Sequence, residues 1–434
     1  MFAADAVVIG GGAAGFFGAV TLAEAAPGKR VLLLERSGNL LAKVKISGGG
    51  RCNVTHACFE PTQLVRFYPR GGRELRAAFA RWQPRDTVEW FAQRGVALKT
   101  ESDGRMFPVT DSSQTIIDCL MLAARGSGVE IRTHTGVRGI KPLSLPDSEI
   151  GHQQSAIRNL NGFALDLGDG QELRSRALLI AAGGLRPKME KILHDLGHDI
   201  IPAAPSIFTF NIRDPRLEGL QGLSVAEARI EAPAFKLDAT GPTLITHWGL
   251  SGPGVLRLSA WGAREMQAAG YRFPIRINWL HGQKGTFEMA REALLAAKSA
   301  NQRRQLGAFS PFPVLPSRLW ESFLKFVQLA PESRWADAPV KKLNLLAQEL
   351  TAAQFEVTGK GVFKEEFVTA GGVSRAEVDF RTMQSRIVPG LHFAGEVLDV
   401  DGITGGFNFQ SAWTTGRLAG LAMAEALVRP VTRL

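Results

Sequence analysis

The sequence predicts an α/β protein in which both ends of the chain have strand-and-helix character and a β-rich, partly helical region lies between them. A strand, a glycine-rich turn, a helix and a second strand follow one another within residues 6–35. Short β-type runs separated by proline and glycine occupy residues 202–279, and a strand, a glycine-rich loop and a long helix occupy residues 391–427. Strands that alternate with helices are typical of parallel sheets, whereas closely spaced short strands are typical of antiparallel barrels or sandwiches.

Residues 6–35 read AVVIGGGAAGFFGAVTLAEAAPGKRVLLLE and contain the pattern Gly10-x-Gly12-x-x-Gly15. Gly10 allows the tight turn after the strand, Gly12 lets the backbone approach a pyrophosphate, and Gly15 lets the helix pack closely on the sheet. The N-terminus of this helix favours an anion because free N–H groups and the helix dipole point there. Glu35 ends the second strand about 20 residues further on, where a carboxylate accepts hydrogen bonds from an adenosine ribose. We therefore expect dinucleotide binding rather than a glycine-rich turn without function.

A second glycine-rich segment runs from Lys43 to Asn53. Its three consecutive glycines, Gly48, Gly49 and Gly50, are flanked by basic and polar residues. Consecutive glycines permit a tight turn that presents backbone N–H groups to an anion. The segment indicates either such an anion-binding turn or a flexible surface loop.

Length and composition limit the class of protein. A chain of 434 residues is too long for one compact core and predicts two or three domains. The 45% of apolar and 21% of charged residues are ordinary for a soluble globular protein. The three cysteines form no CxxC motif, which argues against a disulfide framework and favours a reducing cytoplasm. We expect no membrane span, since no window offers about 20 uninterrupted apolar residues, and no signal peptide or metal site.

The net charge of +10 raises the question of nucleic acid. The densest group of arginines, between Arg66 and Arg105, is interleaved with acidic residues, and residues 74–94 have the apolar spacing of a helix. A solvated helix face explains this group best. The alternative is a positive field that attracts an anionic cofactor or substrate.

Five motifs follow one another along the chain: the fingerprint of residues 6–35, KISGGGRCN at 45–53, THWGLSGP at 246–253, VTAGGV at 368–373 and FAGEVLDVDGITGGFN at 393–408. Together they resemble the BaiN-like (YhiN-type) family of FAD-dependent oxidoreductases. The resemblance implies a Rossmann-like FAD-binding domain of the two-dinucleotide-binding-domain flavoprotein type. By this resemblance we expect the FAD-binding domain at 1–195 and 366–434, a β-barrel-like domain at 196–283 and 351–365, and a helical domain at 284–350.

The resemblance also implies which segments hold FAD. The first glycine turn and Glu35 hold the ADP half, Gly395 and Glu396 face the ribityl and pyrophosphate portion, and residues 405–408 face the pyrimidine side of the isoalloxazine ring. A positive helix end near that ring stabilises the anionic reduced flavin. The expected cofactor-binding residues are Gly10, Gly12, Ala13, Ala14, Gly15, Glu35, Arg36, Lys43, Ser47, Gly48, Gly49, Gly50, Arg51, Cys52, Asn53, Val137, Ala182, Gly183, Gly184, Gly395, Glu396, Asp401, Gly405, Gly406, Phe407 and Asn408.

Cys52 and His247 are the candidate catalytic residues, and Ser251 is a further reactive group near His247. Cys52 lies beside Arg51 and the glycine turn, an environment that lowers the pKa of a thiol. The alternative for Cys52 is a small buried residue. His247 is expected either to exchange a proton with the substrate or to fix a turn of the barrel.

The leading hypothesis is an FAD-dependent oxidoreductase that exchanges hydride between flavin N5 and a small organic substrate. No second strand-associated GxGxxG is present, so we expect no separate NAD(P)H domain. Two electron donors stay open. One is NAD(P)H, which would dock directly over the flavin as a transient co-substrate, and the other is a substrate that is itself the reductant. The alternatives are an FAD-dependent RNA-modifying or RNA-binding flavoprotein, which the positive charge motivates, and a non-catalytic FAD redox sensor. The residues do not indicate the oligomeric state.

Overall fold

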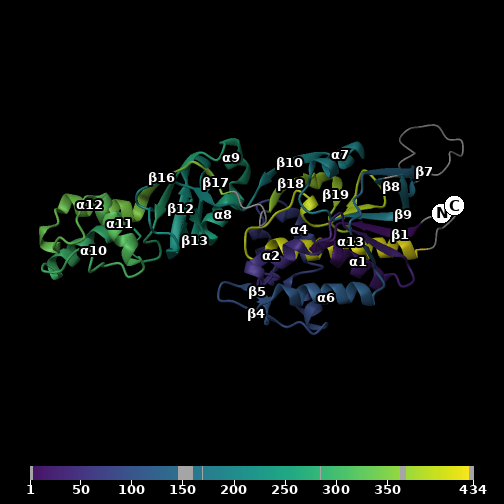
Figure 1. Cartoon of the computed structure of the whole chain (residues 1–434), viewed down its shortest axis with the longest axis horizontal. Coiled ribbons are helices and arrows are strands. Elements are labelled where there is room, and N and C mark those ends of the chain that lie inside the picture. Colours follow the sequence, from purple (N-terminus) through teal and green to yellow (C-terminus); the bar gives the residue numbers. More distant parts are fainter. Residues whose placement is uncertain (1–2, 145–159, 169, 284, 362–367, 430–434) are drawn as a thin grey trace. The chain divides into compact units, whose positions relative to one another are not determined.

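The structure is a computed structural model that describes residues 3–144, 160–168, 170–283, 285–361 and 368–429. The chain forms two compact units (Figure 1). Unit 1 comprises residues 1–204 and 368–434, and unit 2 comprises residues 205–367. Both ends of the chain therefore belong to the same unit.

Unit 1 is built on a parallel sheet. Its first strand, β1 (Ala4–Ile9), pairs in parallel with β2 (Val31–Leu34) and with β9 (Gln171–Ile180). β6 (Glu130–Arg132) and β21 (Leu391–Phe393) continue the parallel pairing on either side. The last parallel strand therefore comes from the far end of the sequence, which confirms the predicted Rossmann-like α/β class.

Two helices from opposite ends of the sequence pack against each other beside this sheet. They are α1 (Ala13–Ala25) and α13 (Phe407–Val428). Glycines allow their backbones to come close: a Cβ added at Gly420 would lie 2.5 Å from the carbonyl oxygen of Gly18, and one at Gly416 would lie 2.6 Å from that of Ala14. Figure 1 shows the two helices side by side. Both helices therefore begin within unit 1, and each begins directly after its own glycine turn.

Smaller elements complete unit 1. The run of residues 74–94, predicted as one helical pattern, forms two helices because Pro84 begins the second of them and Gln83 and Asp86 cap it reciprocally. The remaining elements are α2 (Ala42–Gly50), β3 (Thr55–His56), α3 (Pro61–Leu64), α4 (Gly72–Phe79), α5 (Pro84–Ala92), β4 (Leu98–Thr100), β5 (Arg105–Pro108), α6 (Ser113–Gly126), β7 (Gly139–Ser144), β8 (Leu160–Gly168), α7 (Pro187–Asp195), β10 (Ile200–Pro205), β18 (Thr369–Val373), β19 (Val378–Asp379) and β20 (Gln384–Ser385).

Unit 2 combines an antiparallel sheet with helices. In the described residues the sheet has seven strands in the order β16-β15-β12-β13-β14-β11-β17. The strands are β11 (Phe210–Asn211), β12 (Ser224–Ala232), β13 (Leu237–Thr246), β14 (Gly249–Ser251), β15 (Phe273–Asn278), β16 (Ala353–Val357) and β17 (Gly359–Lys360). The helices are α8 (Pro253–Trp261), α9 (Ala263–Ala268), α10 (Phe287–Ala300), α11 (Ser317–Phe326) and α12 (Val340–Ala352).

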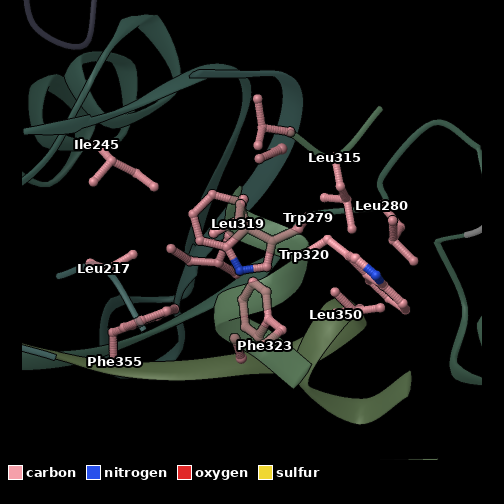
Figure 2. Packing of buried hydrophobic residues seen from close by; sticks show 14 of the residues in the cluster. Leu217, Ile245, Trp279, Leu280, Leu315, Leu319, Trp320, Phe323, Leu350 and Phe355 are labelled. Carbon is pink, nitrogen blue, oxygen red and sulfur yellow. The ribbon is translucent and has the colours of Figure 1, made fainter. Parts of the chain in front are cut away.

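The sheet and the helices of unit 2 share a hydrophobic core (Figure 2). Trp279, which follows β15, packs against Phe323 of α11 and Phe355 of β16, with ring centroids 6.2 Å apart in both pairs. Leu319 and Trp320 of α11 are also fully buried in this core. The division of this region into a β-barrel-like and a helical domain stays a prediction.

Candidate functional site

The first glycine turn places three glycines in different surroundings. Gly10 has φ +115°, and a Cβ there would lie 2.3 Å from the carbonyl oxygen of Ala181, the residue that follows β9. A Cβ at Gly15 would lie 1.9 Å from the carbonyl oxygen of Gly10. A Cβ at Gly12 would meet no described atom within 4 Å. Gly10 and Gly15 are therefore required by the fold, whereas Gly12 faces open space.

The N-terminus of α1 lies at this turn. Gly12 is its N-cap residue, and within the described part of the chain no side chain caps it and no acidic residue lies in its first turn. The first N–H groups of a helix lack partners inside the helix. The backbone at Ala13 and Ala14 therefore offers donors and a positive dipole end to an anion.

Glu35 lies beside this turn. One carboxylate oxygen, Oε2, accepts a hydrogen bond from the N–H of Gly11 at 2.9 Å. The other, Oε1, accepts from the N–H and the hydroxyl of Ser37 at 2.9 and 2.8 Å. These bonds fix the carboxylate at the end of β2, next to the glycine turn. Glu35 therefore lies beside the turn as the sequence expects, and its contact with a ribose stays a prediction.

The segment after β6 lies next to the Glu35 region. The N–H of Thr135 donates to the carbonyl oxygen of Glu35 at 2.8 Å, and a Cβ at Gly136 would lie 3.3 Å from Cβ of Arg36. Val137 itself is buried, and the Arg36 side chain is exposed. The structure thus brings Val137 and Arg36 near Glu35, and their contact with adenine stays a prediction.

The second glycine segment forms the end of α2 and then leaves helical geometry. Ser47, Gly48 and Gly49 have non-helical backbone angles, and φ is +57°, +68° and +84° at Gly48, Gly49 and Gly50. A Cβ at Gly49 or Gly50 would meet no atom of the described chain within 4 Å. This open, left-handed backbone is compatible with either of the two interpretations drawn from the sequence.

Two of the basic side chains around this turn, those of Arg51 and Lys43, are already paired with carboxylates. Arg51 forms ion pairs with Glu101 at 2.6 Å and with Asp111 at 3.5 Å, and it lies over the ring of Phe107 at 4.0 Å. The Lys43 ammonium forms an ion pair with Glu396. These carboxylates offset the charges of Arg51 and Lys43, so the backbone N–H groups of the glycine turn are better candidates for contact with an anion than these two side chains.

Cys52 requires a correction. The sequence suggests a lowered thiol pKa beside Arg51, but Cys52 is completely buried, and burial raises the pKa of its thiol to about 12. The thiol therefore stays protonated at neutral pH, because desolvation disfavours the thiolate. The structure favours the alternative of a small buried residue.

Glu396 connects three of the predicted segments. Besides its ion pair with Lys43, its Oε1 accepts from the N–H of Thr369 at 2.8 Å. A Cβ at Gly183, after β9, would lie 3.8 Å from Glu396 Oε2, and one at Gly184 would lie 2.7 Å from the Thr369 hydroxyl. The end of β9, the start of α2 and the loop that begins at Gly395 therefore meet in unit 1, and Ala182 lies exposed at the same strand end.

The second helix that begins directly after a glycine turn is α13. Gly406 is its N-cap residue with φ +93°, and no described side chain caps the helix from within its own sequence. Asn53, oriented so that its amide oxygen faces the turn, accepts from the N–H of Gly406 at 2.9 Å. Asn408 holds the loop by donating to the carbonyl oxygen of Gly402 at 2.7 Å and accepting from its N–H at 2.8 Å. The side chains of Asn53 and Asn408 thus shape the turn at Gly405 and Gly406.

Residues that the motifs did not predict also support this loop. Asp401, one of the expected cofactor-binding residues, is fully buried and forms an ion pair with Arg70, which the motifs do not include. The Tyr68 hydroxyl donates to the carbonyl oxygen of Phe407 at 2.6 Å, and the ring of His56 stacks on that of Phe407 at 4.6 Å. No spacing in the sequence signals these partners because they lie more than 300 residues from the loop.

The other candidate reactive residues, His247 and Ser251, lie in unit 2. His247 is exposed in the two-residue turn between β13 and β14. Its side chain makes no hydrogen bond with another described residue, while backbone pairing of Thr246 with Gly249 closes the turn. The role of fixing the turn is therefore not supported for its side chain, and proton exchange stays a prediction.

Comparison with known proteins identifies the family. The model described as "HI0933-like protein Rossmann domain" matches residues 4–422. A ribosomal RNA dihydrouridine synthase of Escherichia coli (strain K12) is 32% identical over 429 residues, which cover 95% of this chain and 96% of that protein. A 3-dehydro-bile acid delta(4,6)-reductase of Clostridium scindens is 28% identical over 432 residues, which cover 96% and 98%.

Solved structures agree on the fold. A 3-ketosteroid-delta4-(5alpha)-dehydrogenase from Rhodococcus jostii RHA1 matches with a TM-score of 0.51 and 14% identity, covering 98% of both chains. At that identity the likeness shows the fold alone. None of the helices that the structure describes is long and apolar enough to cross a membrane. The family match over nearly the whole sequence confirms the resemblance of the five motifs: the chain belongs to the HI0933-like Rossmann family.

Proposed function

We propose that this enzyme reduces a carbon–carbon double bond conjugated to a carbonyl group, with FAD held by the two glycine-rich ends of unit 1. The observation that carries the cofactor assignment is the open turn at Gly12, beside a carboxylate fixed at Glu35. These residues fit the ADP half of a dinucleotide because an uncapped helix start suits a pyrophosphate and a fixed carboxylate suits ribose hydroxyls.

The names of two relatives support the choice of reaction. One is a dihydrouridine synthase and the other a delta(4,6)-reductase of 3-dehydro-bile acids. Both names describe saturation of a double bond next to a carbonyl group, in a uracil ring or in a steroid ketone. Such a reduction adds a hydride to the carbon distant from the carbonyl and a proton to the carbon beside it. When bound, FAD supplies the hydride exchange, and the protein supplies position and electrostatics.

The residues of unit 1 hold and orient the ring system in this proposal. The start of α13 presents its positive end at Gly406, which favours a negative charge nearby. Asn53, Asn408 and the buried ion pair of Arg70 with Asp401 keep this turn in place. The exposed His247 of unit 2 is our candidate for proton transfer to the substrate.

Two substrate classes follow from this chemistry. A small organic ketone with a conjugated double bond is the first. A uracil base in RNA is the second, favoured by the 32% identity with the ribosomal RNA enzyme over nearly both chains and by the net charge of +10. We further propose NAD(P)H as a transient donor that docks directly at the flavin, since the sequence contains no second nucleotide-binding fingerprint.

A reduction and reoxidation experiment tests the proposal. The purified protein, loaded with FAD, is treated anaerobically with NADH or NADPH while the flavin absorbance is followed. It is then mixed either with a conjugated steroid ketone or with unmodified ribosomal RNA transcripts. We expect bleaching followed by reoxidation, with a saturated ketone or dihydrouridine as the product. Reduced flavin that is reoxidised by neither substrate class would overturn the proposed reaction.

A further inference from the structure

A concentration of positive charge lies in unit 2, from the last turn of α10 to the first turn of α12. Residues 298–342 contain eight basic and three acidic residues, a net charge of +5, against +10 for the whole chain. About a tenth of the sequence therefore carries half of the net charge. The resemblance that indicates the oxidoreductase assigns no role to these side chains.

Backbone contacts bring six of the basic residues to one end of the helical part. Residues 305 and 334 form an isolated antiparallel bridge, and the N–H of Trp335 donates to the carbonyl oxygen of Arg304 at 2.9 Å. The Lys298 ammonium donates to the carbonyl oxygens of Ala336 and Ala338 at 2.8 and 2.6 Å, which ties the end of α10 to the residues just before α12. We call this group the basic end, and it consists of Lys298, Arg303, Arg304, Arg334, Lys341 and Lys342.

Several of these side chains are available to a partner. Arg303, Arg334 and Lys341 are exposed, and with the residues that the structure describes they make no side-chain hydrogen bond or ion pair. The acidic residues that lie nearest in sequence, Glu332 and Asp337, form no ion pair with the basic end within the described chain. Buried Arg216 of the same unit, by contrast, pairs with two carboxylates. Like charges held together oppose folding, so the exposed charges of Arg303, Arg334 and Lys341 do not stabilise the fold.

We propose that the basic end binds the phosphate backbone of RNA and thereby holds an RNA substrate on the enzyme. This inference rests on the proposed function for its choice of RNA. Clustered arginines and lysines that are free of carboxylates suit a chain of phosphates, and such contacts position a nucleic acid without reading its sequence. A small ketone carries no negative charge with which six basic side chains could form ion pairs.

The test compares two triple variants of the full-length, FAD-loaded protein. The first is R303A/R334A/K341A, whose side chains support no other described residue. The matched control is K29A/R125A/K141A, which removes three cations from unit 1. Binding to unmodified ribosomal RNA transcripts is measured at several salt concentrations. Three lost phosphate contacts weaken binding on the order of 100-fold at 0.15 M salt and make the slope of log K against log salt shallower by about 2 to 3.

The outcomes separate this inference from the proposed function. The inference is supported if the first variant loses affinity and salt dependence while the control and the flavin spectrum stay unchanged. It is refuted if both variants bind RNA as the wild type does, and that result leaves the RNA substrate intact. If the wild type binds no RNA, or binds anionic phosphatidylserine vesicles instead, the basic end has another partner. Reduction of conjugated ketones by that same wild type would then uphold the oxidoreductase.

Discussion

Substitution of Gly12 by alanine separates a contact with the cofactor from a requirement of the fold. Gly12 has φ −94° and ψ −171°, which any residue adopts, and an added Cβ would meet no described atom within 4 Å. The protein without cofactor therefore has room for the methyl group. If the pyrophosphate lies against this backbone, the methyl group occupies space that the phosphates need.

The expected magnitude follows from this difference. Replacing an N-cap glycine by alanine costs about 1 kcal/mol or less, so we expect the melting temperature of the apoprotein to fall by about 2 °C or less. Overpacking by one methyl group at a close contact costs about 1 to 3 kcal/mol, which weakens FAD binding by roughly 5-fold to 150-fold. Gly15→Ala should behave differently, because its Cβ would lie 1.9 Å from the Gly10 carbonyl oxygen and would disturb the fold itself.

The assay is a titration of apoprotein with FAD, followed by flavin fluorescence, together with a thermal melt of each apoprotein. Gly126→Ala is the matched control, since Gly126 ends α6 and its added Cβ would likewise meet no described atom within 4 Å. We expect the control to bind FAD as the wild type does. Equal FAD affinity in Gly12→Ala and the wild type would refute the placement of the pyrophosphate at this turn.

Three further predictions concern single side chains. Glu35→Gln should weaken FAD binding by about 10-fold to 100-fold but leave FMN binding unchanged, because FMN lacks the adenosine ribose; equal losses for both flavins would contradict the assignment. In Cys52→Ala, NAD(P)H should reduce the flavin at the wild-type rate in stopped-flow measurements. In the wild type, iodoacetamide at pH 8 should leave the buried Cys52 unmodified until the protein unfolds. Burial lowers the pKa of His392 to about 4, so the unfolded chain binds the extra proton first. The contribution of neutral His392 to the free energy of unfolding should be fully present above about pH 6.5 and should fall by about 3 kcal/mol as the pH drops to 4. Urea unfolding of His392→Leu should lack this component, and an unchanged pH dependence would refute the assignment.

The sequence predicts the first glycine turn and the two ends of the sheet well because these features are local. Strand, turn and helix signals at residues 6–35 depend on spacing within one stretch, and glycine positions such as Gly10 and Gly15 follow from close backbone contacts. The family motifs then connect the two ends. Apolar periodicity across residues 74–94 does not by itself show the break at Pro84, where α5 begins.

The surroundings of individual side chains were less accessible to sequence reasoning. Cys52 next to Arg51 suggested an activated thiol, but Arg51 turns towards Glu101 and the thiol is buried. Arg70 and Tyr68 support the loop at residues 401–408 from more than 300 positions away, so no local pattern predicts them. Burial and long-range pairing are tertiary properties, which explains why residue types alone left an activated and a buried Cys52 both open.

The most direct test of the central claim is the identity of the cofactor in the purified wild-type protein. Visible absorption and mass spectrometry of the material released on denaturation measure which flavin is present and how much of it. The account predicts FAD, about one molecule per chain, and a markedly lower content in Gly12→Ala purified in parallel. Protein that contains no flavin and takes up none on incubation with FAD would contradict it.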